Sequence, residues 1–173
     1  MLEEQKLVFS YMVRKYHPKD RGQCRALWRE LTEWHREIYQ DQNIGRIHPE
    51  DYFDKHLAEI GSDRIWVATD KEQVVGFIGL IVKGNEGEVE PLIVSRAYRL
   101  KGIGKLLLKE VVREAPSMGI RLLSVKPIAR NVEAIKFFYK QGFKNLGEVE
   151  LFMDFTRRRW KRGPKLFRCH FNF

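Results

Sequence analysis

The sequence predicts a single α/β domain, because segments with the two-residue period of β-strands alternate with segments of helical period along the chain. The predicted order of elements is β-α-α-β-β-β-α-β-α-β-β. A length of 173 residues is typical of one domain, and no repeat, linker or low-complexity stretch divides residues 1–173.

Each predicted element ends at a proline, a glycine or a polar turn. The expected strands cover residues 11–16, 64–69, 74–82, 88–95, 120–125, 146–155 and 166–173. The expected helices cover residues 23–39, 50–60, 103–115 and 131–141, the last with Asn131 as its N-cap and Gly142 as its stop. Pro91 lies inside a predicted strand and lacks the N–H that a sheet needs. We therefore expect a bulge or an unpaired edge at that point.

Composition limits the class of protein. The 43% of hydrophobic residues is ordinary for a packed core, and the net charge of +9 is compatible with nucleic acid, acidic membrane or phosphorylated ligands. Two distant cysteines, Cys24 and Cys169, favour a reduced, cytoplasmic protein over a disulfide framework or a thiolate zinc site. We read no signal peptide and no apolar run long enough to span a membrane. The five histidines show no ligand spacing, so we expect no metal.

The segment Arg99–Gly104, with the sequence RLKGIG, leads from a predicted strand directly into a helix. Glycines let the backbone approach an anion closely, and successive N–H groups at a helix N-terminus favour negative charge. Arg99, Lys101 and Lys105 add mobile positive charge, so a diphosphate is the expected ligand. Leu107 stands where a dinucleotide fingerprint needs its third glycine, and Leu106 stands where a P-loop needs serine or threonine.

A second pattern follows downstream, NVEAIKFFYKQGF at residues 131–143. The two patterns in this order resemble the acetyl-CoA-binding motifs of the GCN5-related N-acetyltransferase (GNAT) superfamily, most sharply over residues 74–143. The resemblance implies a mixed, mostly antiparallel sheet with splayed parallel central strands and flanking helices. It also implies that the protein transfers an acetyl group from acetyl-CoA, its co-substrate, to a primary amine.

The resemblance assigns cofactor contacts to two parts of the chain. Backbone amides of the loop would bind the pyrophosphate of coenzyme A, and the pantetheine arm would lie between residues 88–95 and residues 120–125, as an added strand does. The Leu92 amide would face the thioester carbonyl. The residues implied in cofactor binding are Leu92, Ile93, Val94, Arg99, Leu100, Lys101, Gly102, Ile103, Gly104, Lys105, Asn131 and Phe138. A capping role would account for Asn131 equally well.

Two glutamates are candidates to accept the proton of the amine. Strand alternation places Glu88, Glu90, Leu92 and Val94 on one face, and Glu88 has the position of the glutamate base in the histone-acetylating branch of the family. The position of the family's tyrosine acid holds Phe138 instead. The thiolate could be protonated by Tyr139 or by water, or could leave unprotonated, and these alternatives stay open.

Residues 30–59 hold eight acids and three bases, a net charge of −5, which favours a cationic acceptor such as a small-molecule amine or a basic peptide. In the same region Trp28 and Tyr39 could line the acceptor pocket, whereas helical spacing favours a core position for Trp34. Residues 155–173 hold seven bases and no acid. They leave open a subunit contact in a homodimer, although we expect neither a nucleic-acid nor a membrane partner. An alternative function is a non-catalytic domain that binds or senses acyl-CoA.

Overall fold

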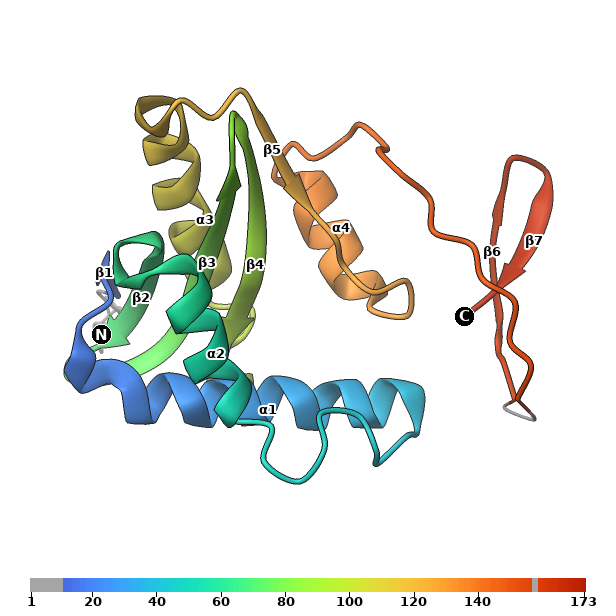
Figure 1. The fold of residues 1–173 in the computed structure, drawn as a ribbon, viewed down its shortest axis with the longest axis horizontal. Coiled ribbons are helices and arrows are strands. Elements are labelled where there is room, and N and C mark those ends of the chain that lie inside the picture. The colour runs from blue at the N-terminus through green and yellow to red at the C-terminus, as the bar shows by residue number, and fades with distance from the viewer. Residues whose placement is uncertain (1–10, 157–158) are drawn as a thin grey trace, which may run out of the picture. The chain divides into compact units, whose positions relative to one another are not determined.

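The computed structural model describes residues 11–156 and 159–173 of the chain. It divides into two compact units, Met1–Lys126 and Pro127–Phe173. Each unit has its own sheet, with five strands in the first and two in the second, as labelled in Figure 1.

The first unit contains the strands β1 (Met12–Lys15), β2 (Ile65–Asp70), β3 (Gln73–Lys83), β4 (Glu86–Val94) and β5 (Leu122–Val125). Its α-helices are α1 (Arg21–Tyr39), α2 (Asp51–Ile60) and α3 (Ile103–Glu114), and a 3-10 helix, η3 (Arg96–Tyr98), follows β4. The sequence predicts all of these strands and α-helices to within two residues at each end. Among the residues that the structure describes, no helix has the length and apolar content needed to cross a membrane.

The five strands of the first sheet lie in chain order, β1 to β5. Neighbouring strands are antiparallel except β4 and β5, which are parallel. The predicted mixed, mostly antiparallel sheet is therefore confirmed. The β4–β5 pairing covers only residues 86–89 of β4, so among the described residues the rest of that strand pairs with β3 alone.

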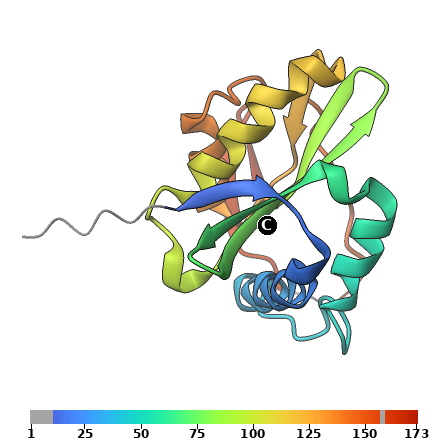
Figure 2. The same cartoon turned by 90° about the vertical axis from the view of Figure 1, so that its left-hand side faces the viewer.

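Helices cover both faces of this sheet, with α1 and α2 on one face and α3 on the other (Figure 2). The glycines of β3 identify the two faces. A Cβ atom at Gly79 would meet His56 and Ile60 of α2, whereas one at Gly76 would meet Leu107 of α3. Residues three apart on a strand point to opposite faces, which agrees with these contacts.

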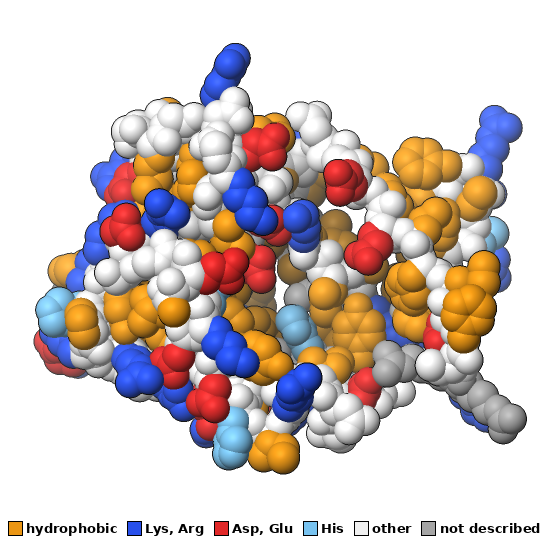
Figure 3. Space-filling model, viewed as in Figure 1, with side chains coloured by type: hydrophobic (Ala, Val, Ile, Leu, Met, Phe, Trp, Pro, Cys, Tyr) orange, Lys and Arg blue, Asp and Glu red, His pale blue; other side chains and the backbone are white. Residues whose placement is uncertain are grey.

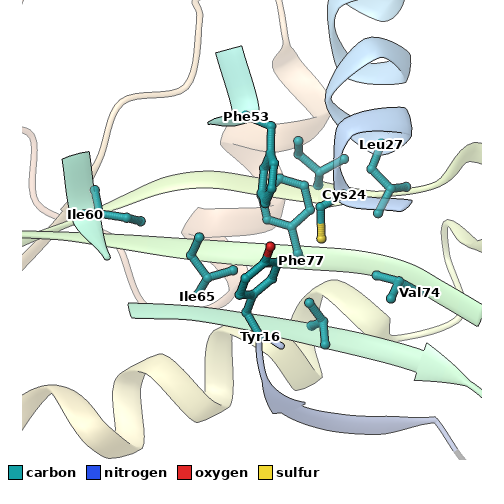
Figure 4. Close-up of a cluster of buried hydrophobic side chains, with 10 residues drawn as sticks. Tyr16, Cys24, Leu27, Phe53, Ile60, Ile65, Val74 and Phe77 are labelled. Carbon is teal, nitrogen blue, oxygen red and sulfur yellow. The ribbon is translucent and has the colours of Figure 1, made fainter. Parts of the chain in front are cut away.

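One core cluster of buried hydrophobic side chains lies between the sheet and the pair α1 and α2 (Figure 4). At its centre the ring of Phe53 from α2 meets the ring of Phe77 from β3 edge to face, with centroids 5.4 Å apart. Trp28 from α1 stacks on Phe77 at 6.3 Å. Ile93 of β4 belongs to the same buried cluster, so the core holds the strand that carries the candidate site.

The second unit contains α4 (Val132–Lys140) and a hairpin of β6 (Arg162–Leu166) and β7 (Cys169–Asn172). The structure confirms the predicted helix but not the predicted strand over residues 146–155, which has no regular secondary structure. The segment is rich in apolar residues, as a strand often is, but no strand among the described residues pairs with it.

The prediction of one terminal strand over residues 166–173 is also wrong. Phe167 and Arg168 both have positive φ angles, 50° and 66°, and form the turn of the β6–β7 hairpin. Two consecutive left-handed residues are typical of a tight hairpin turn, which is usually recognised in a sequence by Asn-Gly or Asp-Gly. Neither pair occurs here, so the alternating apolar residues concealed the turn.

Candidate functional site

The anion-binding loop predicted from the sequence joins η3 to α3. Leu100 has a φ of 62° and a fully exposed side chain, and Gly102, the N-cap of α3, has a φ of 83°. No side chain caps this N-terminus. The first N–H groups of α3 therefore lie at the positive end of a twelve-residue helix, with the exposed Lys105 in its first turn.

Arg99 differs from the mobile cation expected from the sequence. Its Nε donates a hydrogen bond of 3.2 Å to the Val94 carbonyl, and its guanidinium lies 5.0 Å from the centre of the Trp34 ring. Burial against these groups lowers the pKa of Arg99 from its ordinary value. Arg99 thus links the end of β4 to α1.

Trp34 also supports Arg96, the first residue of η3. Arg96 lies 5.1 Å from the Trp34 ring centre, forms an ion pair with Glu37, and donates its backbone N–H to Glu30. The interpretation of Trp34 as a core residue is therefore wrong, because it lies half-buried beneath two guanidinium groups. Three residues of α1 hold the segment from which the anion-binding loop starts.

The backbone of β4 is open on one side beyond Val89, its last residue paired with β5. On the other side Ser95 N–H donates to Val75 O across the β3–β4 ladder. Because antiparallel residues alternate in the direction of their backbone groups, Leu92 and Val94 turn theirs away from β3. The Arg99 Nε donor on the Val94 carbonyl agrees with this orientation.

A bulge in β4 places the predicted site residues on two opposite faces of the sheet. Glu88 pairs with Ile81 and Leu92 pairs with Ile78, so Gly79 opposes the two residues between Val89 and Leu92. Ile78 and Ile81 point to opposite faces of the sheet. The expectation that Glu88, Glu90, Leu92 and Val94 share one face is therefore wrong, because strict alternation allows for no extra residue. The predicted bulge at Pro91 is confirmed.

The two glutamates lie on the α2 side of this bulge. Glu88 Oε2 is 2.8 Å from Lys126 Nζ, and the Glu88 side chain is 17% exposed. Glu90 is more exposed, and its pKa is raised from its ordinary value, chiefly by desolvation and then by repulsion from Glu88 and from Glu59 of α2. Carboxylates of such different surroundings can take different roles in proton transfer.

Arginines of α1 pair with three of the eight acids in residues 30–59. Arg21, Arg25 and Arg29 lie at helical spacing on α1. They form ion pairs with Asp54, Asp51 and Glu50 on and before α2. Figure 3 accordingly shows basic and acidic side chains interspersed on this face. Arg21, Arg25 and Arg29 precede residue 30 and so are not part of the net charge of −5 given for residues 30–59.

Three predicted site residues belong to the second unit. Asn131 Oδ1 accepts a hydrogen bond of 3.1 Å from the Ala134 N–H, which confirms its capping role on α4. Phe138 is buried, and its ring lies 5.1 Å from the Phe137 ring. Tyr139 is 57% exposed.

Several residues near β4 were not predicted from the sequence as part of the site. In the sequence Lys126 stood out only by its place after a strand, and Gly79 was one of two glycines in the apolar run over residues 74–82. His56 could have been found, since it lies three residues after Phe53 and four before Ile60 on the buried side of α2. No group of three or more potential metal ligands occurs within residues 11–156 and 159–173.

Comparison with known proteins identifies relatives. The sequence profile of the acetyltransferase (GNAT) family matches residues 28–143. The PanD regulatory factor of Salmonella typhimurium is 32% identical over 80 residues, which cover 46% of this chain and 62% of that protein. YwnH of Bacillus subtilis, described as a candidate phosphinothricin acetyltransferase, is 32% identical over 108 residues, which cover 58% of this chain and 66% of YwnH. The chain thus spans less than two thirds of the length of either curated relative.

Among solved structures, a PaiA N-acetyltransferase from Thermoplasma acidophilum in complex with coenzyme A is similar, with a TM-score of 0.69. The two chains are 23% identical, and the match covers 82% of this chain and 93% of that one. At this identity the likeness shows a shared fold.

Proposed function

The chain belongs to the acetyltransferase (GNAT) family, and from this we propose that it is an acetyl-CoA-dependent N-acetyltransferase acting on a primary amine. The observation that carries the proposal is the open edge of β4 next to an uncapped helix N-terminus. This arrangement suits an extended ligand that carries a diphosphate at one end, as acetyl-CoA does.

The residues of the first unit fit that ligand in two ways. The N–H groups of the loop over residues 100–105 are suited to the pyrophosphate, because Gly102 and Leu100 adopt the left-handed conformations that turn the backbone toward an anion. Leu92, Ile93 and Val94 form the edge along which the pantetheine arm would pair. The hydrogen bond from Arg99 Nε to Val94 O agrees with a carbonyl that faces away from β3, the direction in which the arm would pair.

The proposed reaction is a direct attack of the amine nitrogen on the thioester carbon. The N–C bond forms, the C–S bond breaks, and a proton of the amine passes to a carboxylate of β4. We assign that role to Glu88, with Glu90 as the second carboxylate on the same face. The Leu92 N–H would stabilise the developing charge on the thioester oxygen, a contact worth about 3–4 kcal/mol where such donors have been removed from other enzymes.

The proton donor to the departing thiolate stays open. It could be Tyr139 or water, or the thiolate could leave unprotonated. Of Phe138 and Tyr139, only Tyr139 carries a hydroxyl that could donate a proton. Tyr139 is also exposed, whereas Phe138 is buried against a neighbouring ring. For Asn131 we propose a cofactor contact through its amide nitrogen, because the helix cap uses only its oxygen.

For the acceptor we propose a small-molecule amine or a basic peptide. Support comes from Glu59 and Glu88, whose charges both raise the pKa of Glu90 on the α2 side of β4. Within the described part of the chain Glu59 forms no ion pair, unlike the acids bound by Arg21, Arg25 and Arg29.

We further propose that residues 1–173 function as one acetyltransferase domain, in the cytoplasm and without nucleic-acid or membrane partners. Cys24 and Cys169 are both free thiols, which suits a reducing compartment. A homodimer that uses the basic segment around β6 stays an open alternative.

The test is an acetyl-CoA turnover screen across classes of amine, with release of free coenzyme A detected by a thiol reagent. We expect turnover with amines of at least one class and none with a Gly102→Glu variant. If that variant binds coenzyme A as tightly as the wild type, the assignment of the loop is wrong.

A second candidate function is binding or sensing of acyl-CoA without turnover. It is favoured by Phe138 at the position of the expected acid and by the relationship to a protein named as a regulatory factor. Acetyl-CoA binding without release of coenzyme A in the presence of every amine class would support this alternative.

A further inference from the structure

His56 is a buried histidine for which the proposed reaction has no role. It lies on α2 with only 6% of its surface exposed, and its ring centre is 5.3 Å from that of Trp28. Its Nε2 atom is buried and has no hydrogen-bond partner of normal geometry in the described part of the chain. A buried polar atom of this kind costs free energy unless it forms a hydrogen bond.

The carbonyl oxygen of Glu90 lies close to His56 Nε2. A Cβ atom built on Gly79 would be 2.8 Å from His56 Nε2 and 2.4 Å from Glu90 O, so both atoms approach the same point above β3. Any side chain at position 79 would push them apart. The Glu90 backbone also raises the pKa of His56, against the larger lowering by burial.

The Glu90 carbonyl lies in the bulge of β4. Gly79 opposes both Glu90 and Pro91, and Leu92 resumes the regular ladder opposite Ile78. The register shifts at this point, so the regular ladder is interrupted where the Glu90 carbonyl lies. Its orientation decides how the next two residues leave the bulge, and hence the direction of the Leu92 N–H.

We propose that His56 is a positioning residue that donates its Nε2–H to the Glu90 carbonyl and so directs the Leu92 N–H toward the thioester oxygen. The inference rests on the proposed function, since it assigns a support to the amide donor of that same site. His56 touches neither substrate in this role. Burial keeps the imidazole neutral at neutral pH, and a neutral ring protonated at Nε2 is the donor that the carbonyl needs.

The test compares two substitutions of similar length, His56→Gln and His56→Met. Glutamine keeps an N–H donor at the end of the side chain and methionine does not. We expect kcat within about threefold of the wild type for His56→Gln and a loss of about 10- to 100-fold for His56→Met. The KM for acetyl-CoA and the unfolding midpoint should be the same in both. Equal loss in the two variants, or full activity of His56→Met, would overturn the proposal.

Gly79→Ala gives an independent variant, because its methyl group would enter the space between His56 Nε2 and Glu90 O. We expect it to lower kcat, and we expect little further loss when it is combined with His56→Met, since both disturb one contact. Fully additive losses would contradict this.

A readout without turnover separates this proposal from the proposed function. In ¹⁵N spectra of the full chain without an amine, acetyl-CoA should shift the Leu92 amide resonance in the wild type and in His56→Gln but not in His56→Met, because the acetylated cofactor carries the thioester oxygen. The same response in all three proteins would overturn the role of His56. A wild type that binds coenzyme A but acetylates no amine would overturn the proposed function, and the Leu92 response would still decide the role of His56.

Discussion

The carboxylate of Glu88 lies 2.8 Å from the ammonium nitrogen of Lys126, next to the point at which β4 and β5 cease to pair. This ion pair acts on the neighbouring carboxylate of Glu90. Desolvation, then Glu88 and then Glu59 raise the pKa of Glu90, whereas Lys126 lowers it. The charges around the open edge of β4 therefore oppose one another, and single substitutions should shift the balance in either direction.

The first prediction concerns the titration of Glu90. Removing the Glu59 charge with Glu59→Gln should move the pKa of Glu90 down toward its ordinary value of 4.5, and removing the Lys126 charge with Lys126→Met should move it up. The carboxyl ¹³C resonance of Glu90, followed against pH, measures both shifts. Lys19→Met serves as a control, because Lys19 acts on Asp20 instead. Shifts in the same direction for the two variants would contradict this account.

The second prediction separates the roles of the two glutamates. Glu88→Gln should lower kcat by about 100-fold or more, since a positioned general base contributes about 10²- to 10⁴-fold. Glu90→Gln should raise the KM for the amine with a smaller effect on kcat. Steady-state kinetics of the pair against a single acceptor measure the difference. A wild-type rate in Glu88→Gln would refute its assignment as the base.

The sequence predicts the first unit well because its elements have strong periods. Buried residues such as Leu27 and Leu107 recur at helical spacing, and runs such as Val74–Val82 contain many β-branched residues. The hairpin turn at Phe167 and Arg168 escaped prediction, since neither residue is a usual turn former. Local patterns show which residues alternate but not where an alternating run folds back.

The site was predicted less completely, because contacts between distant segments determine it. The Gly-x-Gly motif identified the loop, but nothing in the sequence showed that Arg99 would lie on Trp34 or that Glu88 would meet Lys126. The bulge opposite Gly79 reversed the face of Leu92 relative to Glu88. A single extra residue in a strand has this effect, and only the register against the neighbouring strand reveals it.

The third prediction tests the anion-binding loop with two matched glycines. Gly102 and Gly84 have positive φ angles of 83° and 60°, and each has open space where a side chain would begin. Replacing either with glutamate should cost about 1–2 kcal/mol of unfolding free energy from backbone strain. Only Gly102→Glu should abolish coenzyme A binding, because it also places a negative charge beside the N–H groups of α3. Calorimetric titration and thermal unfolding of both variants measure the two effects, and equal binding by both would remove the loop from the site.

The fourth prediction separates the structural role of Asn131 from its proposed cofactor contact. Its Oδ1 atom caps α4 by accepting the Ala134 N–H at 3.1 Å. Asn131→Ala should lower the free energy of unfolding by about 1 kcal/mol, since it removes the cap. Asn131→Asp keeps an accepting oxygen and should preserve stability, but it replaces the amide donor with a negative charge. If the amide nitrogen contacts the cofactor, Asn131→Asp should weaken acetyl-CoA binding by about 10-fold, the effect of one lost hydrogen bond. Undiminished binding by a stable Asn131→Asp would leave Asn131 as a helix cap alone.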